Sequence, residues 1–468
     1  MTRGARHVAS LRRAFVAAVL VLPIAVAAQQ APNRRGWLAP DQAVSDDPRR
    51  VPVPPPPPPR TSIVVRNGRV FDGTGAAARP ATLVIRGNHI DRVLPANAPA
   101  SSWPTDAQVI DATGKTVMPG LIDLHTHLTY TEPEVSPEMA GDPSDATLRA
   151  VERLRFFLES GVTSVRDVAS DGSVPFVLKR WVAQHRVPGP RIFAAGRLIT
   201  ATGGHGAEGR NPKSALFDSI REASGPNDWR EAVRENFKAG ADLIKLASHY
   251  SREEIGAAVD EAHALGLRVT VDAETFYIQW AVEAGVDSVE HPLPRTDETV
   301  ALMAKKGVAS VPTLIPYAYI FDASGGYFHS TSRRFDFSKN ANLAMLRKLK
   351  EAGVKLGVGT DLVFDWFRYM PDSYITELKS FVEAGFSVSQ ALTAATKTNA
   401  EILDMADRLG TLEPGKLADV LIVDGQPDVR LDDLAKVDIV IRDGVVEIRG
   451  GQVVVPRHVP VPPPKPRP

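Results

Sequence analysis

An amphipathic segment, a glycine and a short apolar run follow one another repeatedly along the middle of the chain. In residues 145–160 the apolar side chains recur at helical spacing, and Gly161 and the β-branched run 162–165 come next. Residues 228–244 and 251–271 repeat this order. Glycine suits each junction because the residue that follows a helix commonly takes a positive φ. The pattern predicts helices that alternate with strands buried on both faces, as in a parallel sheet covered by helices.

Two of the predicted helices carry a start signal. Asp228 and Ser251 each stand three residues before a glutamate, which is the spacing of a capping box. We therefore expect these helices to begin directly after Asp228 and Ser251.

Eight βα units can be counted, which favours a closed (β/α)₈ barrel over an open doubly wound sheet. Short β runs before and after them predict one small β-sandwich built from both ends of the chain. The predicted domains are a sandwich of residues 61–118 and 402–455 and a barrel of residues 119–401. The barrel strands are expected at residues 121–125, 163–167, 191–194, 243–246, 268–272, 288–291, 309–312 and 355–359.

Both ends of the chain have the character of segments outside the folded part. Residues 1–28 begin with arginines and no acidic residue, continue with an apolar run, and end in small residues at 25–28. This order is typical of a secretory signal peptide, and the apolar run is shorter than the roughly 20 residues that a membrane anchor needs. We expect an exported protein, periplasmic or extracellular, with no membrane attachment after removal of this signal. Proline-rich residues 29–60 and 456–468 are interpreted as a linker and a tail.

Charge and cysteine content exclude some partners and some metal ligands. Lys+Arg and Asp+Glu are equal at 55 each, so the formal net charge is zero and no basic field is available to attract nucleic acid. Cysteine is absent, which excludes disulfides, thiolate metal ligands and cysteine nucleophiles. A metal ion would have to be held by histidine, carboxylate or modified lysine. We expect a small-molecule partner and no nucleic acid, and a homo-oligomer is left open.

Polar residues stand at the carboxyl ends of four predicted strands, where barrel enzymes hold their catalytic groups. His125 and His127 lie on the same side of the first strand because side chains alternate along a strand. Lys245 lies near the end of the fourth strand, His291 ends the sixth, and Asp361 follows the eighth. A single buried histidine is more often a hydrogen-bonded core residue than a ligand. Five such groups at four strand ends nevertheless predict a metal site.

The chain resembles the amidohydrolase superfamily of metal-dependent hydrolases over about residues 61–455. The resemblance rests on three motifs, in residues 118–127 (MPGLIDLHTH), 203–206 (GGHG) and 410–419 (GTLEPGKLAD). The chain looks most like the imidazolonepropionase-like and prolidase-like branch, which includes dipeptidases and N-acyl-amino-acid hydrolases.

The resemblance implies a centre of two divalent ions, with Zn²⁺ expected. His125, His127 and Asp361 would bind one ion. A carboxylated Lys245 would bridge to a second ion, which histidines on strands five and six, His291 among them, would complete. The implied reaction is hydrolysis of a C–N amide bond by an activated water, with Asp361 as the general acid/base.

Strand five departs from this pattern. Where the family has a histidine, the sequence VDAE at residues 271–274 places Asp272. Three interpretations stay open: Asp272 ligates in place of histidine, one ion works alone, or the chain has lost catalysis and only binds a ligand. If Asp272 does not ligate, the site is mononuclear or Glu274 completes it. Lys245 has its own alternative, an ion pair with Asp272 or Glu290.

Three further residues are expected to face the substrate from the barrel mouth. His205 lies in the glycine-rich segment after strand three, and His249 and Tyr250 follow strand four, from which they could contact the substrate carbonyl. Arg210 and Arg295 are candidates for binding a substrate carboxylate. The predicted function is a secreted amidohydrolase acting on a dipeptide, an N-acyl amino acid or a similar amide. The alternative is a non-catalytic or mononuclear relative that binds a small ligand.

Overall fold

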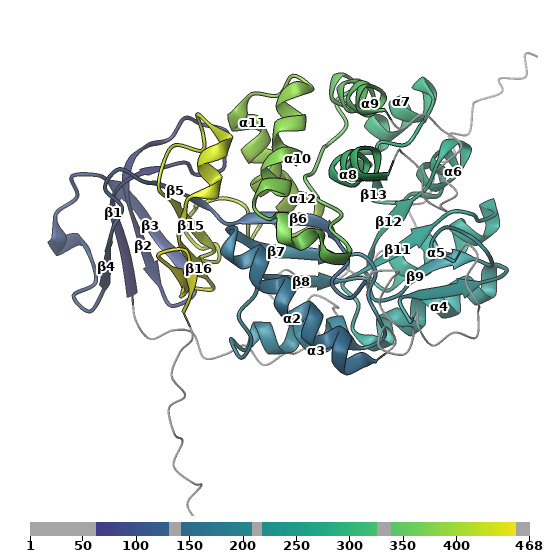
Figure 1. The fold of residues 1–468 in the computed structure, drawn as a ribbon, viewed down its shortest axis with the longest axis horizontal. Helices are drawn as coiled ribbons and strands as arrows, with labels where there is room; N and C mark the ends of the chain where they lie inside the picture. Colours follow the sequence, from purple (N-terminus) through teal and green to yellow (C-terminus); the bar gives the residue numbers. More distant parts are fainter. Residues whose placement is uncertain (1–61, 131–141, 208–217, 325–337, 455–468) are drawn as a thin grey trace, which may run out of the picture.

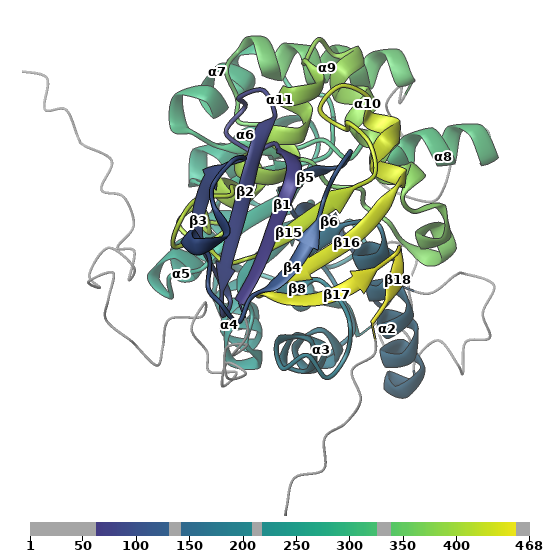
Figure 2. The ribbon, with the colours of Figure 1, turned by 90° about the vertical axis from the view of Figure 1, so that its left-hand side faces the viewer.

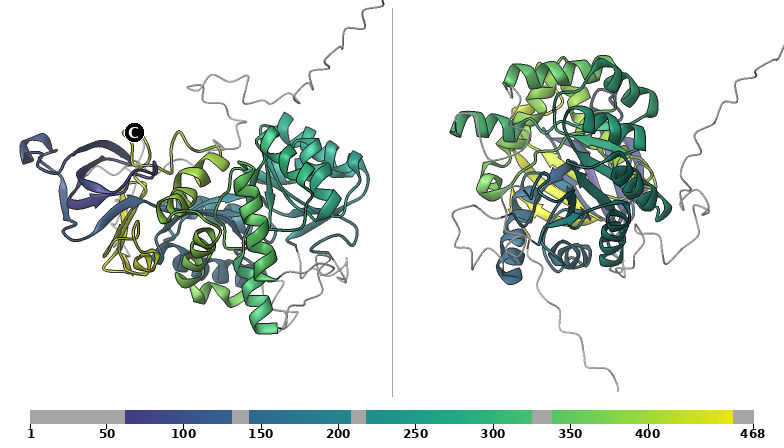
Figure 3. Two further views of the ribbon diagram at one scale, coloured as in Figure 1. Left: turned by 90° about the horizontal axis from the view of Figure 1, so that it is seen from above. Right: turned by 90° about the vertical axis from the view of Figure 1, so that its right-hand side faces the viewer.

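The computed structural model of the chain describes residues 62–130, 142–207, 218–324 and 338–454, without the side chains of residues 320–324. The predicted signal segment, the proline-rich linker and tail, and Arg210 lie outside the described residues. A β-sheet occupies one end of the molecule, and parallel strands surrounded by helices form the rest (Figure 1). Figure 3 shows the same two-part arrangement from above.

Strands from both ends of the chain form one terminal sheet. They are β1 (Ser62–Val70), β2 (Arg79–Arg86), β3 (His89–Pro95), β4 (Gln108–Asp111), β5 (Thr116–Pro119), β15 (Val420–Val423), β16 (Val437–Arg442), β17 (Val445–Arg449) and β18 (Gln452–Val453). Their order is β18-β17-β16-β15-β5-β1-β2-β3, with β4 paired to β1 (Figure 2). The predicted sandwich is thus one continuous sheet, because β5 pairs with both β1 and β15. Ile63, Leu83, Val420 and Ile441 belong to its hydrophobic core.

The barrel strands form two parallel sheets. One contains β6 (Leu121–Thr126), β7 (Val162–Asp167) and β8 (Arg191–Ala194) in that order. The other has the order β10-β9-β11-β12-β13-β14, with bounds β9 (Leu198–Ala201), β10 (Ile220–Ala223), β11 (Leu243–Ala247), β12 (Arg268–Asp272), β13 (Ser288–Glu290) and β14 (Ala309–Val311). Strand three of the barrel is therefore divided into β8 and β9, and β10 is an addition that the sequence pattern did not predict.

The eighth barrel strand, expected at residues 355–359, is irregular. Its backbone donates to β14 through Gly357 N (2.9 Å) and accepts from β6 through Val358 O (3.0 Å), so it links the two sheets. Gly359 allows this close approach, because a Cβ at that position would lie 2.8 Å from the Cβ of His125. The strand order and the surrounding helices are those of the predicted (β/α)₈ barrel.

Helices cover the outside of the barrel. Ser251 forms the predicted capping box with Glu254, and α5 begins at the next residue. The box predicted at Asp228 is wrong: α4 begins earlier, at Pro226, because proline fits the first helical position. The helices are α2 (Pro143–Glu159), α3 (Val174–Ala183), α4 (Pro226–Ala239), α5 (Arg252–Ala264), α6 (Thr275–Ala284), α7 (Asp297–Lys306), α8 (Ile315–Ser324), α9 (Lys339–Glu351), α10 (Asp372–Glu383), α11 (Val388–Thr393) and α12 (Asn399–Ile402). Within the described part of the chain, none of them has the length and apolar character needed to cross a membrane.

Candidate metal centre

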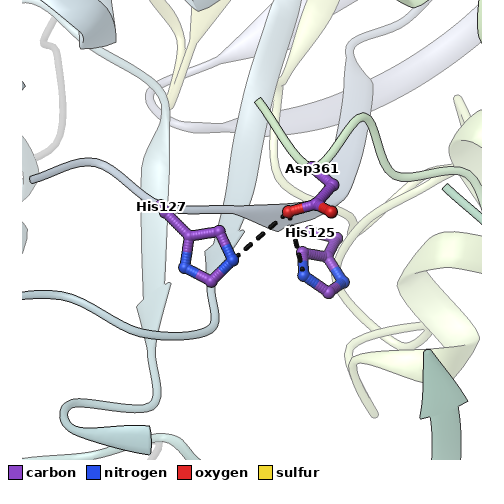
Figure 4. Close-up of side chains that lie close together, drawn as sticks. All are labelled: His125, His127 and Asp361. Carbon is purple, nitrogen blue, oxygen red and sulfur yellow. Dashed lines mark ion pairs between the residues drawn. The ribbon is translucent and has the colours of Figure 1, made fainter. Parts of the chain in front are cut away.

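Two histidines and one aspartate converge at the carboxyl end of β6. His125 is the second-last residue of β6, and His127 directly follows this strand. Asp361 follows the irregular eighth strand. Asp361 Oδ1 lies 3.4 Å from His125 Nε2 and 3.3 Å from His127 Nε2 (Figure 4). One ligand atom from each residue can be chosen so that all three lie within 4.8 Å of one another. The structure therefore brings together the predicted H-x-H pair and the predicted aspartate.

The backbone around Asp361 directs its carboxylate toward the histidines. Asp361 has a φ of 51°, in the left-handed region that residues other than glycine rarely adopt. Its N–H donates to the carbonyl oxygen of His125 at 2.6 Å. Burial opposes ionisation of the carboxyl, but the neighbouring imidazoles of His125 and His291 and a hydrogen bond from His127 outweigh it and keep the pKa below its usual range. Asp361 is consequently a carboxylate at neutral pH.

A second carboxylate, Glu290, orients His125. Its Oε2 lies 2.7 Å from His125 Nδ1, and its Oε1 accepts hydrogen bonds from Arg166 Nη2 at 2.6 Å and from Thr270. These four side chains are buried. Burial would raise the pKa of Glu290, but Arg166 and His125 hold it below its usual range. An ionised Glu290 favours the proton of His125 on Nδ1, which leaves Nε2 with a lone pair directed at the site.

The Nε2 atoms of the two histidines both face Asp361, where they could bind a cation. His125 Nε2 is buried and has no hydrogen-bond partner among the described residues. His127 Nδ1 lies 3.1 Å from the carbonyl oxygen of Ala169, and its Nε2 lies 3.3 Å from Asp361 Oδ1. A buried polar atom without a partner is rare, and a divalent ion would satisfy His125 Nε2. Two imidazoles and a carboxylate are donors that suit Zn²⁺ and similar ions.

Asp272, His291 and His205 form a second cluster beside the first. Asp272 Oδ2, at the end of β12, lies 3.0 Å from His291 Nε2 and 3.2 Å from His205 Nε2. Burial opposes ionisation of Asp272, but the two histidines outweigh it and hold its pKa well below the usual range. His291 follows β13 with a φ of 63°, and its Nδ1 lies 2.6 Å from Thr313 Oγ1. Asp272 thus contacts two histidines. Whether it is a metal ligand, which the sequence left open, stays a prediction.

Lys245 points into the interior from the middle of β11. Only 2% of its surface is exposed. Burial lowers the pKa of its amino group, although Asp272, Glu290 and Asp361 act in the opposite direction. Within the described residues, none of these carboxylates comes within 4.0 Å of its Nζ, so the alternative of a direct ion pair with Asp272 or Glu290 is not seen. A buried amine without such a pair is costly, which favours modification or neutrality.

The remaining predicted residues contact protein groups. His249 Nε2 lies 3.3 Å from Glu274 Oε1, next to the second cluster. Tyr250 is buried and donates its hydroxyl proton to the carbonyl oxygen of Tyr277 at 2.8 Å, so the structure does not bring this hydroxyl into either cluster. The roles of His249 and Tyr250 toward a substrate stay predictions.

Arg295 contacts other groups in the protein interior. It is buried, and its guanidinium donates to the backbone oxygens of Leu293 and His291 and lies 3.5 Å from Met303 Sδ. Burial lowers its pKa to about 10. These interior contacts occupy much of the guanidinium, and the contact of Arg295 with a substrate carboxylate stays a prediction.

Replacement of Glu290 tests its orienting role. Glu290→Gln keeps the shape but removes the charge that holds the proton on His125 Nδ1, so we expect a loss of metal affinity or activity of roughly 10- to 100-fold. Metal titration and kcat measure it. Glu447→Gln is the matched control, because Glu447 lies 2.7 Å from His185 Nδ1 and 2.8 Å from Arg442 Nη2 outside the site. Equal metal affinity and activity in both variants would show that Glu290 does not orient His125.

Comparisons with known proteins place the chain among hydrolases of one family. The model of the amidohydrolase family matches residues 116–448. An imidazolonepropionase of Mesorhizobium japonicum is 28% identical over 369 residues, 70% of this chain and 82% of that protein. The crystal structure of a prolidase complexed with N-methylphosphonate-L-proline has a TM-score of 0.75 and 31% identity, covering 83% of this chain and 100% of the other. A Xaa-Pro dipeptidase with bound methionine has a TM-score of 0.74 and 28% identity, covering 82% and 99%.

These relatives support hydrolysis of a C–N bond as the reaction class. The matched family region covers the whole barrel and, in the terminal sheet, β5, β15, β16 and most of β17. The chain therefore belongs to the amidohydrolase family.

Proposed function

We propose that the chain is an exported, metal-dependent amidohydrolase that cleaves the C–N bond of a small amide, such as a dipeptide or an N-acyl amino acid. The observation that carries the proposal is the cluster of His125, His127 and Asp361, in which a buried imidazole nitrogen has no hydrogen-bond partner in the part of the chain that the structure describes. The prolidase and dipeptidase relatives support the substrate class.

A divalent ion held by His125, His127 and Asp361 would polarise the scissile carbonyl and lower the pKa of water. His125 and His127 orient toward it through the contacts of their Nδ1 atoms with Glu290 and Ala169. Asp361 Oδ1 faces both imidazoles, which leaves Oδ2 as the oxygen that can accept a proton from the attacking water. The same oxygen can then donate that proton to the leaving nitrogen.

The proposal includes a second ion and a carboxylated Lys245. Carboxylation converts the buried amine into an anionic carbamate, which removes the cost of a buried ammonium and supplies oxygen ligands. Asp272 and His291 offer an oxygen and a nitrogen next to it. We expect Zn²⁺ in the first site, and harder ions are favoured in the second by its additional carboxylate.

A hydrolysis screen tests the function. The metal-loaded chain is incubated with dipeptides that include Xaa-Pro sequences, with N-acyl amino acids and with cyclic amides, and amine release is measured. Asp361→Asn protein, prepared in parallel, controls for contaminating hydrolases. Release of amine by the wild type and not by the variant supports the proposal. Tight binding of an amide without any cleavage would instead favour the non-catalytic relative.

Export gives a separate prediction. Because residues 1–28 have the basic, apolar and small-residue order of a signal peptide, we expect the mature chain to begin near Gln29. Mass spectrometry of protein isolated from the native cell envelope measures this. An intact Met1 in that fraction would contradict the prediction.

A further inference from the structure

The loop after β9 carries a histidine into the second cluster. His205 lies between β9 and β10, outside any strand, yet its Nε2 is 3.2 Å from Asp272 Oδ2. The same oxygen lies 3.0 Å from His291 Nε2. One carboxylate oxygen is therefore shared by two imidazole nitrogens that come from different parts of the barrel.

The first cluster also contains a carboxylate oxygen shared by two imidazoles. There, Asp361 Oδ1 is shared by the Nε2 atoms of His125 and His127 at 3.4 and 3.3 Å. In both clusters two imidazole nitrogens thus lie within 3.4 Å of one carboxylate oxygen at the carboxyl end of the barrel. Such a donor set is what a divalent ion such as Zn²⁺ accepts from a protein.

Backbone contacts fix the loop in this position. His205 N donates to the carbonyl oxygen of Ser248 at 2.5 Å, and Ser248 N donates to the carbonyl oxygen of Asp272 at 2.9 Å. Gly204 allows the loop to approach the backbone of the loop after β11 closely, because a Cβ there would be 2.9 Å from Ser248 O and 2.8 Å from His249 N. The imidazole of His205 is consequently held toward Asp272 by the backbone of two neighbouring loops.

Protein groups contact both ring nitrogens of His291. Its Nδ1 lies 2.6 Å from Thr313 Oγ1, and its Nε2 lies 3.0 Å from Asp272 Oδ2. A ring nitrogen and a carboxylate oxygen at this distance share either a proton or a metal ion. A metal ion bound to Asp272 Oδ2 would also lie beside His205 Nε2, which is 3.2 Å from the same oxygen.

We propose that His205 is a direct ligand of the second divalent ion, together with Asp272 and His291. The inference rests on the proposed function, since it requires that the barrel binds metal. It assigns to His205 a metal-binding role in place of a contact with the substrate alone.

The test is the metal content of variants. Wild-type chain, His205→Ala and His205→Asn are loaded with Zn²⁺ or Co²⁺, and bound metal is measured by mass spectrometry and by the visible spectrum of Co²⁺. We expect about two ions in the wild type and about one in both variants, with affinity for the second ion lowered by at least roughly 10- to 100-fold. Added imidazole is expected to restore the second ion to His205→Ala.

His263→Ala is the matched control, because His263 Nε2 also lies 3.0 Å from an aspartate, Asp287, at the opposite end of the barrel. This variant should keep both ions. Unchanged metal content and affinity in the His205 variants would overturn the inference, even if their activity falls. Failure of the proposed function is a different result, namely a wild-type chain that binds no divalent ion and hydrolyses none of the amides.

Discussion

Asp361→Asn is expected to lower kcat by roughly 10²- to 10⁴-fold, the range over which a positioned acid/base contributes. Asparagine keeps an oxygen near His125 and His127 but cannot accept and return a proton. The loss of rate should therefore exceed the loss of metal from the first site. Steady-state kinetics with metal analysis of the same samples measure both quantities.

Asp287→Asn is the control for this variant. Asp287, like Asp361, contacts a histidine, His263, and it also contacts Arg268. It precedes β13 and therefore lies at the opposite end of the barrel from Asp361. Its replacement should leave kcat of the folded protein near the wild-type value. If Asp361→Asn retains the wild-type rate, Asp361 is not the acid/base.

Lys245→Ala is expected to remove the second ion and most of the activity, with a loss of at least roughly 10- to 100-fold. The reason is that the carbamate would supply oxygen ligands that alanine lacks. Short carboxylic acids should restore part of the metal content and the rate, because they mimic the carbamate. For the wild type, reconstitution without CO₂ should leave the second site unfilled.

Lys179→Ala provides the comparison, because Lys179 is an ordinary paired lysine whose Nζ lies 2.6 Å from Asp242 Oδ1. It should bind metal like the wild type, with or without CO₂. Full activity and two bound ions in Lys245→Ala would reject the bridging role of Lys245.

The sequence predicted the barrel because strand and helix signals are local. The apolar runs that became β7, β8, β11 and β12 lie within a residue of their expected bounds, since burial on both faces leaves a pattern in consecutive residues. The eighth strand was expected to be regular. Its backbone is irregular, and Gly357 and Gly359 bring it close to Leu124 and His125 of β6, a contact that depends on the tertiary structure.

The first cluster was also predictable, because the carboxyl ends of parallel strands meet at one end of a barrel. His125, His127 and Asp361 could be grouped by that rule alone, and the structure brings them together. The single continuous sheet was not predictable, since which strands pair across the termini depends on contacts between residues about 300 positions apart.

The orienting contacts were missed for the same reason. Glu290 joins His125 and Arg166, which stand 165 and 124 residues away. A signal did exist: Arg166 and Glu290 are charged residues within apolar strands, the same anomaly that singled out Lys245. The pairing of His205 with Asp272 left no such signal, because a glycine-rich loop has no periodicity that fixes where its side chains point.

Metal content of the full chain tests the central claim most directly. We predict about two divalent ions per chain in the wild type, and loss of the first ion in a His125→Ala/His127→Ala variant. Removal of metal by a chelator should abolish amide hydrolysis, and added Zn²⁺ should restore it. A wild-type chain that holds no divalent ion, and whose hydrolysis is unaffected by the chelator, would contradict the account.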